Sequence, residues 1–140
     1  MGTRRKSREL TMQMLFQGDL GKQPPEQVQK LFWASVEDVD LETRGFAEDL
    51  YRIATTRDEE IDTLIEAHAQ NWRLERMPVV DRNLLRAAVA EMLGFPNTPA
   101  AIIINETLEI GRRFAATESI HFLNGVLDAI ARDLLKKRLA

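Results

Sequence analysis

The apolar residues of this chain recur every three or four positions over most of its length, as they do in amphipathic helices. In the segment from Ser119 to Leu135, one helical stripe collects Ile120, Leu123, Val126, Leu127, Ile130, Leu134 and Leu135. Phe122 lies at the edge of this stripe, and Gly125 faces the opposite side, where a missing side chain lets another molecule approach. We therefore predict a helix with a docking surface beside Phe122. A Phe122 ring that packs under a neighbouring loop fits the same spacing.

Six further segments show helical spacing. Helices are predicted over 4–19, 25–36, 40–54, 56–72, 78–94 and 99–114. Asp40 is a plausible N-cap, and Thr56 with Glu59 three residues later matches a capping box. Pro78 and Pro99 suit the first position of a helix, where the missing N–H is harmless.

One segment has a competing strand-like character. Ile102 to Ile104 is a β-branched run, which is typical of strands. Pro99 before it and the polar residues after it favour a helix instead. The sequence therefore predicts an all-α protein of about seven helices. It forms one domain over residues 1–140, with short connections that favour antiparallel bundles.

Length and composition restrict the class of protein. A chain of 140 residues can bury a substantial core, and this one contains no cysteine, which excludes disulfides and thiol chemistry. It contains no apolar run of membrane-spanning length, and no apolar signal-peptide core follows its basic start. We therefore expect a cytoplasmic protein without a membrane contact.

The charge of the chain is unevenly distributed. The net charge is −3, yet residues 1–10 carry four cationic side chains against the single carboxylate of Glu9. The rest of the chain is correspondingly acidic. A protein with this distribution would bind nucleic acid at one end and not over its whole surface.

The first predicted helix carries a candidate RNA-binding face. Its core face comprises Leu10, Thr11, Met14 and Leu15. The opposite face comprises Arg5, Met12 and Phe16, with Arg4 and Arg8 at the rim. Guanidinium groups pair with phosphates and an aromatic ring stacks on an unpaired base, so this combination suits single-stranded RNA. A solvated basic tail with Phe16 in a second packing layer is the alternative.

The chain shows little sign of catalytic chemistry. His68 and His121 are far apart, and neither has metal-ligand spacing to a carboxylate; His68 lies on an apolar stripe, as core histidines do. No glycine-rich phosphate loop and no nucleophile elbow occur. We therefore predict that the protein is not an enzyme and uses no cofactor and no metal.

Three stretches together resemble the NusB family: residues 4–16, 72–93 and 104–128. The most specific motifs are Asp81-Arg-Asn-Leu-Leu-Arg86, Ile104-Asn-Glu106 and Phe122-Leu-Asn-Gly-Val-Leu-Asp128. This resemblance implies two three-helix bundles packed roughly at right angles, an N-terminal one over about 4–70 and a C-terminal one over about 74–138. It also implies a transcription antitermination factor that binds the boxA sequence of nascent RNA, notably in ribosomal RNA leaders. The implied partners are the small-subunit ribosomal protein NusE and the transcription elongation complex.

The resemblance also assigns residues to sites. The implied RNA-binding residues are Arg4, Arg5, Lys6, Arg8, Phe16, Glu118, Ser119, His121 and Phe122. The implied partner-binding residues are Glu75, Arg76, Asp81 and Arg82.

The chain departs from the family pattern in two places. His121 stands where the family often has lysine, which would make one phosphate contact weaker or pH-dependent. Ala115 follows Phe114 where the family usually has glycine, so this turn must avoid a left-handed backbone.

Other functions fit parts of the sequence. A protein-interaction module without direct RNA binding would use the acidic body to dock a basic protein. A helical DNA-binding repressor is less consistent, because no compact helix-turn-helix with a basic second helix is visible. The sequence leaves a homodimer open, and such a dimer could cover the arginine-rich face.

Overall fold

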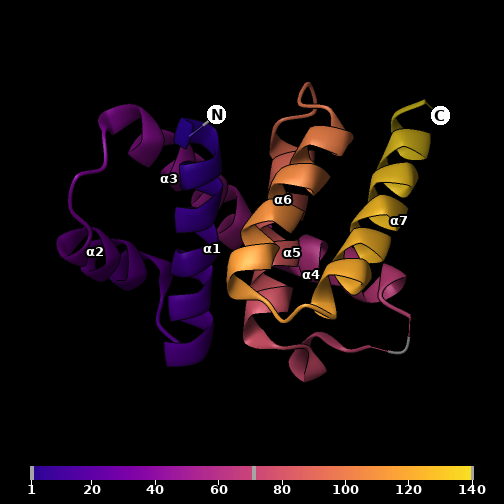
Figure 1. Ribbon diagram of the computed structural model, residues 1–140, viewed down its shortest axis with the longest axis horizontal. Helices are drawn as coiled ribbons and strands as arrows, with labels where there is room; N and C mark the ends of the chain where they lie inside the picture. The colour runs from indigo at the N-terminus through magenta and orange to yellow at the C-terminus, as the bar shows by residue number, and fades with distance from the viewer. Residues whose placement is uncertain (1, 71, 140) are drawn as a thin grey trace.

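The computed structural model describes residues 2–70 and 72–139. Within these ranges it forms seven α-helices and one short 3-10 helix, and it contains no strand (Figure 1). The helices are α1 (Gly2–Gly21), α2 (Pro25–Ser35), α3 (Leu41–Thr56), α4 (Asp58–His68), α5 (Val79–Gly94), α6 (Ala100–Phe114) and α7 (Ser119–Leu139), with η1 (Leu74–Arg76) before α5. The predicted all-α class with seven helices is confirmed. No helix in these ranges is both long and apolar enough to cross a membrane.

Helix α5 is the centre of the molecule. It packs against α1, α3, α4, α6 and α7. In Figure 1, α1 to α3 gather on one side of the molecule, and α6 and α7 lie on the other. The predicted bundle boundary near residue 70 stays a prediction, since α4 packs against α5 and α7 as well as against α3.

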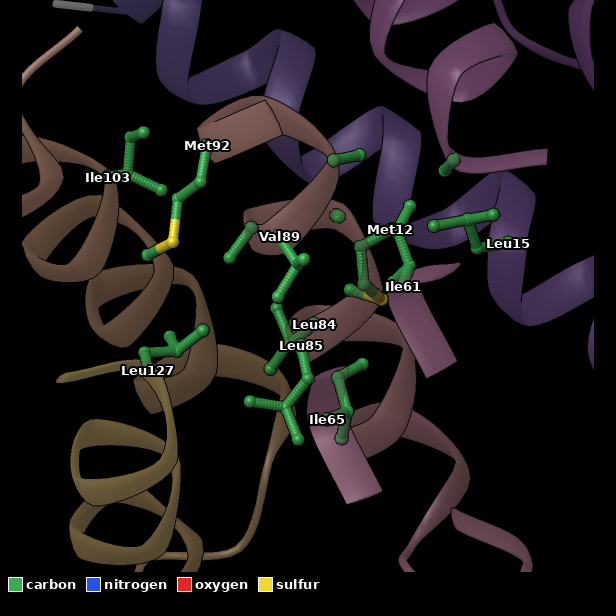
Figure 2. Close-up of a cluster of buried hydrophobic side chains, with 14 of the residues drawn as sticks. Met12, Leu15, Ile61, Ile65, Leu84, Leu85, Val89, Met92, Ile103 and Leu127 are labelled. Carbon is green, nitrogen blue, oxygen red and sulfur yellow. The ribbon is translucent and has the colours of Figure 1, made fainter. Parts of the chain in front are cut away.

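The side chains around α5 form one continuous apolar core. Leu85 and Val89 of α5 are fully buried, and side chains from four other helices point toward them (Figure 2). Those neighbours include Met12 and Leu15 of α1, Ile61 and Ile65 of α4, Ile103 of α6 and Leu127 of α7. Burial of each such side chain contributes roughly 1.5–3 kcal/mol. The core therefore fixes α1 against α5 and α6, which determines where the arginines of α1 lie.

Two helix ends follow from local chemistry. The Asp40 side chain accepts a hydrogen bond from the Thr43 N–H at 2.7 Å, which confirms Asp40 as the N-cap of α3. Helix α1 ends in a Schellman motif, in which the Gln23 N–H donates to the Gly18 carbonyl at 3.1 Å. Lys22, with φ of 52°, is the left-handed residue of that motif.

Three predicted helix starts were wrong. Thr56 is the last residue of α3, and its hydroxyl donates to the Arg52 carbonyl at 2.7 Å, so no capping box forms with Glu59. Pro78 and Pro99 are extended and stand immediately before α5 and α6. Proline is also tolerated at this position, one residue before the helix, because a residue there needs no N–H partner within the helix.

Some predicted faces also differ from the structure. Met12, which was expected to lie opposite the core, is buried, because α2, α3, α5 and α6 all contact α1. Leu135 was expected in the core stripe of α7 and is exposed. Trp72 lies beyond α4, which ends at His68, and is half-exposed. Periodicity gives one face per helix and cannot tell how many neighbours that helix will have.

Candidate nucleic-acid interface

The basic residues at the start of α1 lie in an ordered helix and not in a free tail. Arg4 is exposed, and its guanidinium carbon lies 3.9 Å from the centroid of the Phe46 ring on α3, a cation–π contact. Arg5 binds Glu106 of α6 through two hydrogen bonds of 2.9 and 2.8 Å. Lys6 is exposed and lies 3.3 Å from Glu9, one turn later on α1. These contacts hold three cations at the surface in fixed positions.

Arg8 differs from these three residues because it points into the protein. Its guanidinium makes two hydrogen bonds of 2.7 and 2.8 Å to Glu91 of α5, and both side chains are buried. A bidentate pair of this kind satisfies both charges away from water. Arg8 was assigned to the RNA-binding group from the sequence, and that assignment stays a prediction. In this structure the guanidinium of Arg8 already donates its hydrogen bonds to Glu91.

The pair of Arg5 and Glu106 shifts the titration of both groups. The hydrogen bonds to Glu106 and its negative charge raise the pKa of Arg5. The hydrogen bonds from Arg5 lower the pKa of Glu106, and its burial acts in the opposite direction. Both groups therefore stay charged at neutral pH, and Arg5 keeps a permanent positive charge at this surface.

A second set of predicted residues surrounds an apolar cavity at the start of α7. The cavity has a volume of about 280 Å³ and is lined by Trp72, Met77, Pro78, Asp81, Glu118, Ser119 and Phe122. The Trp72 and Phe122 rings meet edge to face, with centroids 6.1 Å apart. Phe122 is half-buried and packs against the core, yet it also lines this opening. An aromatic pair beside a cavity can receive a further flat ring or an apolar side chain.

Asp81 gives this cavity a polar group. It is buried, and its Oδ1 atom has no hydrogen-bond partner in the described part of the chain. Burial raises the pKa of Asp81, and the neighbouring Ser119 side chain only partly offsets this effect. A buried acceptor without a partner is costly. Asp81 is therefore suited to accept a hydrogen bond from a group that enters the cavity.

The other predicted partner-binding residues divide into two kinds. Glu75 and Arg76 are exposed on η1. Arg82 is turned inward, where it donates two hydrogen bonds of 2.6 and 2.9 Å to Asp19 of α1. Burial acts to raise the pKa of Asp19, but the hydrogen bonds from Arg82 and Asn83 outweigh it and lower that pKa. Arg82 therefore holds helices together in this structure, and Glu75 and Arg76 remain accessible.

The structure joins some predicted residues and separates others. Asp81, from the predicted partner group, lies in the same cavity as Glu118, Ser119 and Phe122, from the predicted RNA group. Arg4, Arg5 and Lys6 lie near the other end of the molecule, because α1 begins at one edge and α7 begins at the opposite edge (Figure 1).

Two predicted residues stand apart from both sets. Phe16 is half-buried and packs against the core in the second half of α1, and His121 is exposed on the first turn of α7.

Sequence reasoning missed the carboxylates that organise the cations. Glu91 was not singled out, Glu106 was named only as part of the Ile104–Glu106 motif, and Trp72 was placed inside the predicted helix 56–72. Glu91 lies among apolar residues of α5. A glutamate in such a position could have been predicted to need a cationic partner, because a buried charge must be paired.

The histidines and carboxylates give no indication of a metal centre. His68 is half-buried, and its Nε2 atom lies 3.0 Å from Asp133 of α7, so it ties α4 to α7. Over residues 2–70 and 72–139, no group of three or more histidine or carboxylate side chains is placed to hold a metal ion.

The family model described as NusB family matches residues 5–132. The chain belongs to the NusB family. A relative named transcription antitermination protein NusB, from Koribacter versatilis, is 59% identical over 98% of this chain and 94% of its own length. A second relative with that name, from Desulforapulum autotrophicum, is 44% identical over 93% of this chain and 92% of its own length.

Solved structures give the same result. NusB from T. maritima superimposes with a TM-score of 0.84 at 33% identity, over 92% of this chain and 90% of that one. A chain from a crystal structure of the antitermination factors NusB and NusE with double-stranded RNA has a TM-score of 0.86 at 26% identity, over 95% of this chain and 98% of that one. This protein is thus a NusB-family antitermination factor, and the family is not one of enzymes.

Proposed function

We propose that this NusB-family protein binds single-stranded boxA RNA of nascent transcripts, notably ribosomal RNA leaders, together with the ribosomal protein NusE. It would act in the cytoplasm as part of a transcription elongation complex. The observation that carries the proposal is the ordered cationic start of α1, where Arg4, Arg5 and Lys6 are held at the surface. The similarity to a NusB chain solved with NusE and RNA supports it.

In this proposal, some residues would contact the phosphates of the RNA and others would contact its bases. Arg4, Arg5 and Lys6 neutralise phosphates, which gives affinity without sequence information. Phe122 and Trp72 present aromatic surfaces at the cavity, where one unpaired base or one partner side chain can stack. Glu75 and Arg76 on η1 are accessible to NusE, and the exposed His121 on the first turn of α7 is accessible to RNA.

Salt-dependent binding of a labelled boxA RNA tests this function. Fluorescence anisotropy is measured at several salt concentrations, with and without NusE. Each phosphate contact with single-stranded RNA contributes about −0.7 to the slope of log affinity against log salt. Three to four contacts therefore predict a slope between about −2 and −3, and tighter binding when NusE is added. A slope near zero would contradict the electrostatic role of α1.

Replacement of Phe122 tests the cavity. If Phe122 stacks on a base, Phe122→Ala should weaken RNA binding by about 1–3 kcal/mol and leave the salt slope unchanged. The melting transition followed by circular dichroism serves as the control. If the helical transition is lost, Phe122 acts as part of the core and not as a stacking surface.

A protein-interaction module without direct RNA binding is the second candidate. It is favoured by the pairing of Arg5 with Glu106 and of Arg8 with Glu91, which partly neutralises the basic segment. A stable complex with NusE, combined with no anisotropy change on boxA RNA in its presence or absence, would support this function instead.

A further inference from the structure

The contact between α1 and α6 has its charges arranged in two layers. The two helices lie side by side (Figure 1), and hydrogen bonds join Arg5 to Glu106 across the contact. The carboxylates form the inner layer, since the Glu9 side chain is 6% exposed and that of Glu106 is 19% exposed. The cations form the outer layer, with side-chain exposure of 39% for Arg5 and 50% for Lys6. Arg5 and Lys6 therefore face solvent above these two carboxylates, and Glu109 of α6 adds one exposed carboxylate, 45% exposed, close enough to Arg5 to raise its pKa.

Arg113 of α6 belongs to this outer layer. Its Nη1 atom donates to Glu9 of α1 at 2.6 Å, and its side chain is 66% exposed, more than those of Arg5 and Lys6. A guanidinium carries five N–H donors, and this is the one hydrogen bond of Arg113 within the described residues. Glu9 therefore fixes the position of Arg113 and leaves most of its donors free for an anion.

Arg113 also occupies the gap between the two sets of predicted site residues. It lies seven residues after Glu106, which places it about 10 Å further along the axis of α6. The chain then turns through 115–118 into α7, where Glu118 and Phe122 line the aromatic cavity. A cation at this position lies between Arg5 and the cavity.

We propose that Arg113 is a phosphate-binding residue, and that an RNA strand runs along the seam between α1 and α6 from the start of α1 toward the Trp72–Phe122 cavity. This inference rests on the proposed RNA-binding function. In the proposed phosphate-binding set, Arg113 takes the place of Arg8. The guanidinium of Arg8 is bound to buried Glu91, whereas that of Arg113 faces solvent. The phosphate-binding set becomes Arg4, Arg5, Lys6 and Arg113, with an expected salt slope of about −3.

Charge substitutions at Arg113 test the proposal. Arg113→Gln should make the slope of log affinity against log salt less negative by about 0.7. If the variant and the unmodified protein have equal affinity at about 1 M salt, this difference in slope makes the variant bind about fivefold more weakly at about 0.1 M salt. Arg113→Lys should restore the slope, because lysine keeps the positive charge.

Arg112→Gln is the matched control. Arg112 is the neighbouring arginine on the same helix, is also exposed, and pairs with Glu109 on α6 itself instead of with α1. It should change the slope by clearly less than Arg113→Gln. Thermal melting of each variant shows whether the fold is kept, and Lys6 still neutralises Glu9 when Arg113 is replaced.

The possible results separate this inference from the proposed function. If the unmodified protein binds RNA with a slope between about −2 and −3 and Arg113→Gln leaves it unchanged, the seam inference is wrong and RNA binding stands. Equal effects of Arg112→Gln and Arg113→Gln would also overturn it, since they would indicate a general charge effect. If the unmodified protein shows no salt-dependent binding, the proposed function itself fails.

Discussion

Arg5 and Arg8 are one turn apart on α1, yet their surroundings give them different tasks. Arg5 meets a carboxylate at the surface and keeps part of its guanidinium in solvent, whereas Arg8 meets Glu91 in the interior. Removing one member of a buried ion pair leaves the other charge without compensation. The identity of a residue therefore says less about its role than the depth at which its partner lies.

This difference predicts the stability of two variants. Arg8→Gln should lower the free energy of unfolding by about 3 kcal/mol, because it leaves Glu91 charged and buried. Lys6→Gln should change it by less than about 0.5 kcal/mol, because Lys6 is exposed. Urea unfolding followed by circular dichroism measures both. Equal stability of the two variants would show that Arg8 is not a structural residue.

At the scale of elements, α1 supports both the core and the candidate interface. Its middle packs against α2, α3, α5 and α6, and its first two turns carry the exposed cations. Deletion of residues 1–8 would remove Arg8 as well as the surface cations. A loss of RNA binding in such a truncation could therefore reflect a loosened fold, and single charge substitutions are the better test.

The end of α1 offers a prediction at the same scale. Lys22 holds a left-handed backbone conformation, which costs most residues about 1–2 kcal/mol and costs glycine nothing. Lys22→Gly should therefore raise the free energy of unfolding by about 1 kcal/mol. Lys30→Gly, an exposed position within α2, should lower it by a similar amount. Thermal melting of the two variants checks both signs.

At the scale of the whole molecule, a network of charges joins three helices. Asp19 of α1 accepts hydrogen bonds from Arg82 and Arg86 of α5, and Arg86 also binds Asp62 of α4 at 2.9 and 3.2 Å. The network crosses from the N-terminal helices to the C-terminal ones. The network therefore fixes the position of the α1 surface relative to the η1 surface.

Asp19 gives the molecule a predicted pH dependence. Its pKa is lowered in the folded state, so its stabilising contribution is present above the unfolded value of about 3.9 and is lost as pH falls through the folded value. Asp19→Asn should cost about 2–3 kcal/mol at pH 7, and the difference from the unmodified protein should shrink below about pH 4.

An exposed carboxylate provides the control for this prediction. Asp49 pairs with Arg52 on the surface of α3, so Asp49→Asn should cost less than about 1 kcal/mol at any pH. Urea unfolding at pH 7 and pH 3.5 compares the two variants. A constant effect of Asp19→Asn over this range would contradict the assignment.

The sequence by itself determined the elements and the family. Seven helices, the N-cap at Asp40 and most core faces follow from the repeat of 3.6 residues and from side chains that act within one turn. The motifs near 81–86 and 104–128 lie within the part of the chain that the NusB family model matches. These properties depend on residues close together in the chain, so they are visible without coordinates.

Only the tertiary structure decided which charges meet. Arg8 and Glu91 are 83 positions apart, and Arg5 and Glu106 are 101 positions apart. The meeting of Trp72 with Phe122, and the position of Arg113 over Glu9, likewise depend on how whole helices pack. Helical periodicity gives the angle of a side chain around its own axis but contains no distance to another helix. The division of the arginines into structural and accessible ones therefore emerged only when α1, α5 and α6 were placed together.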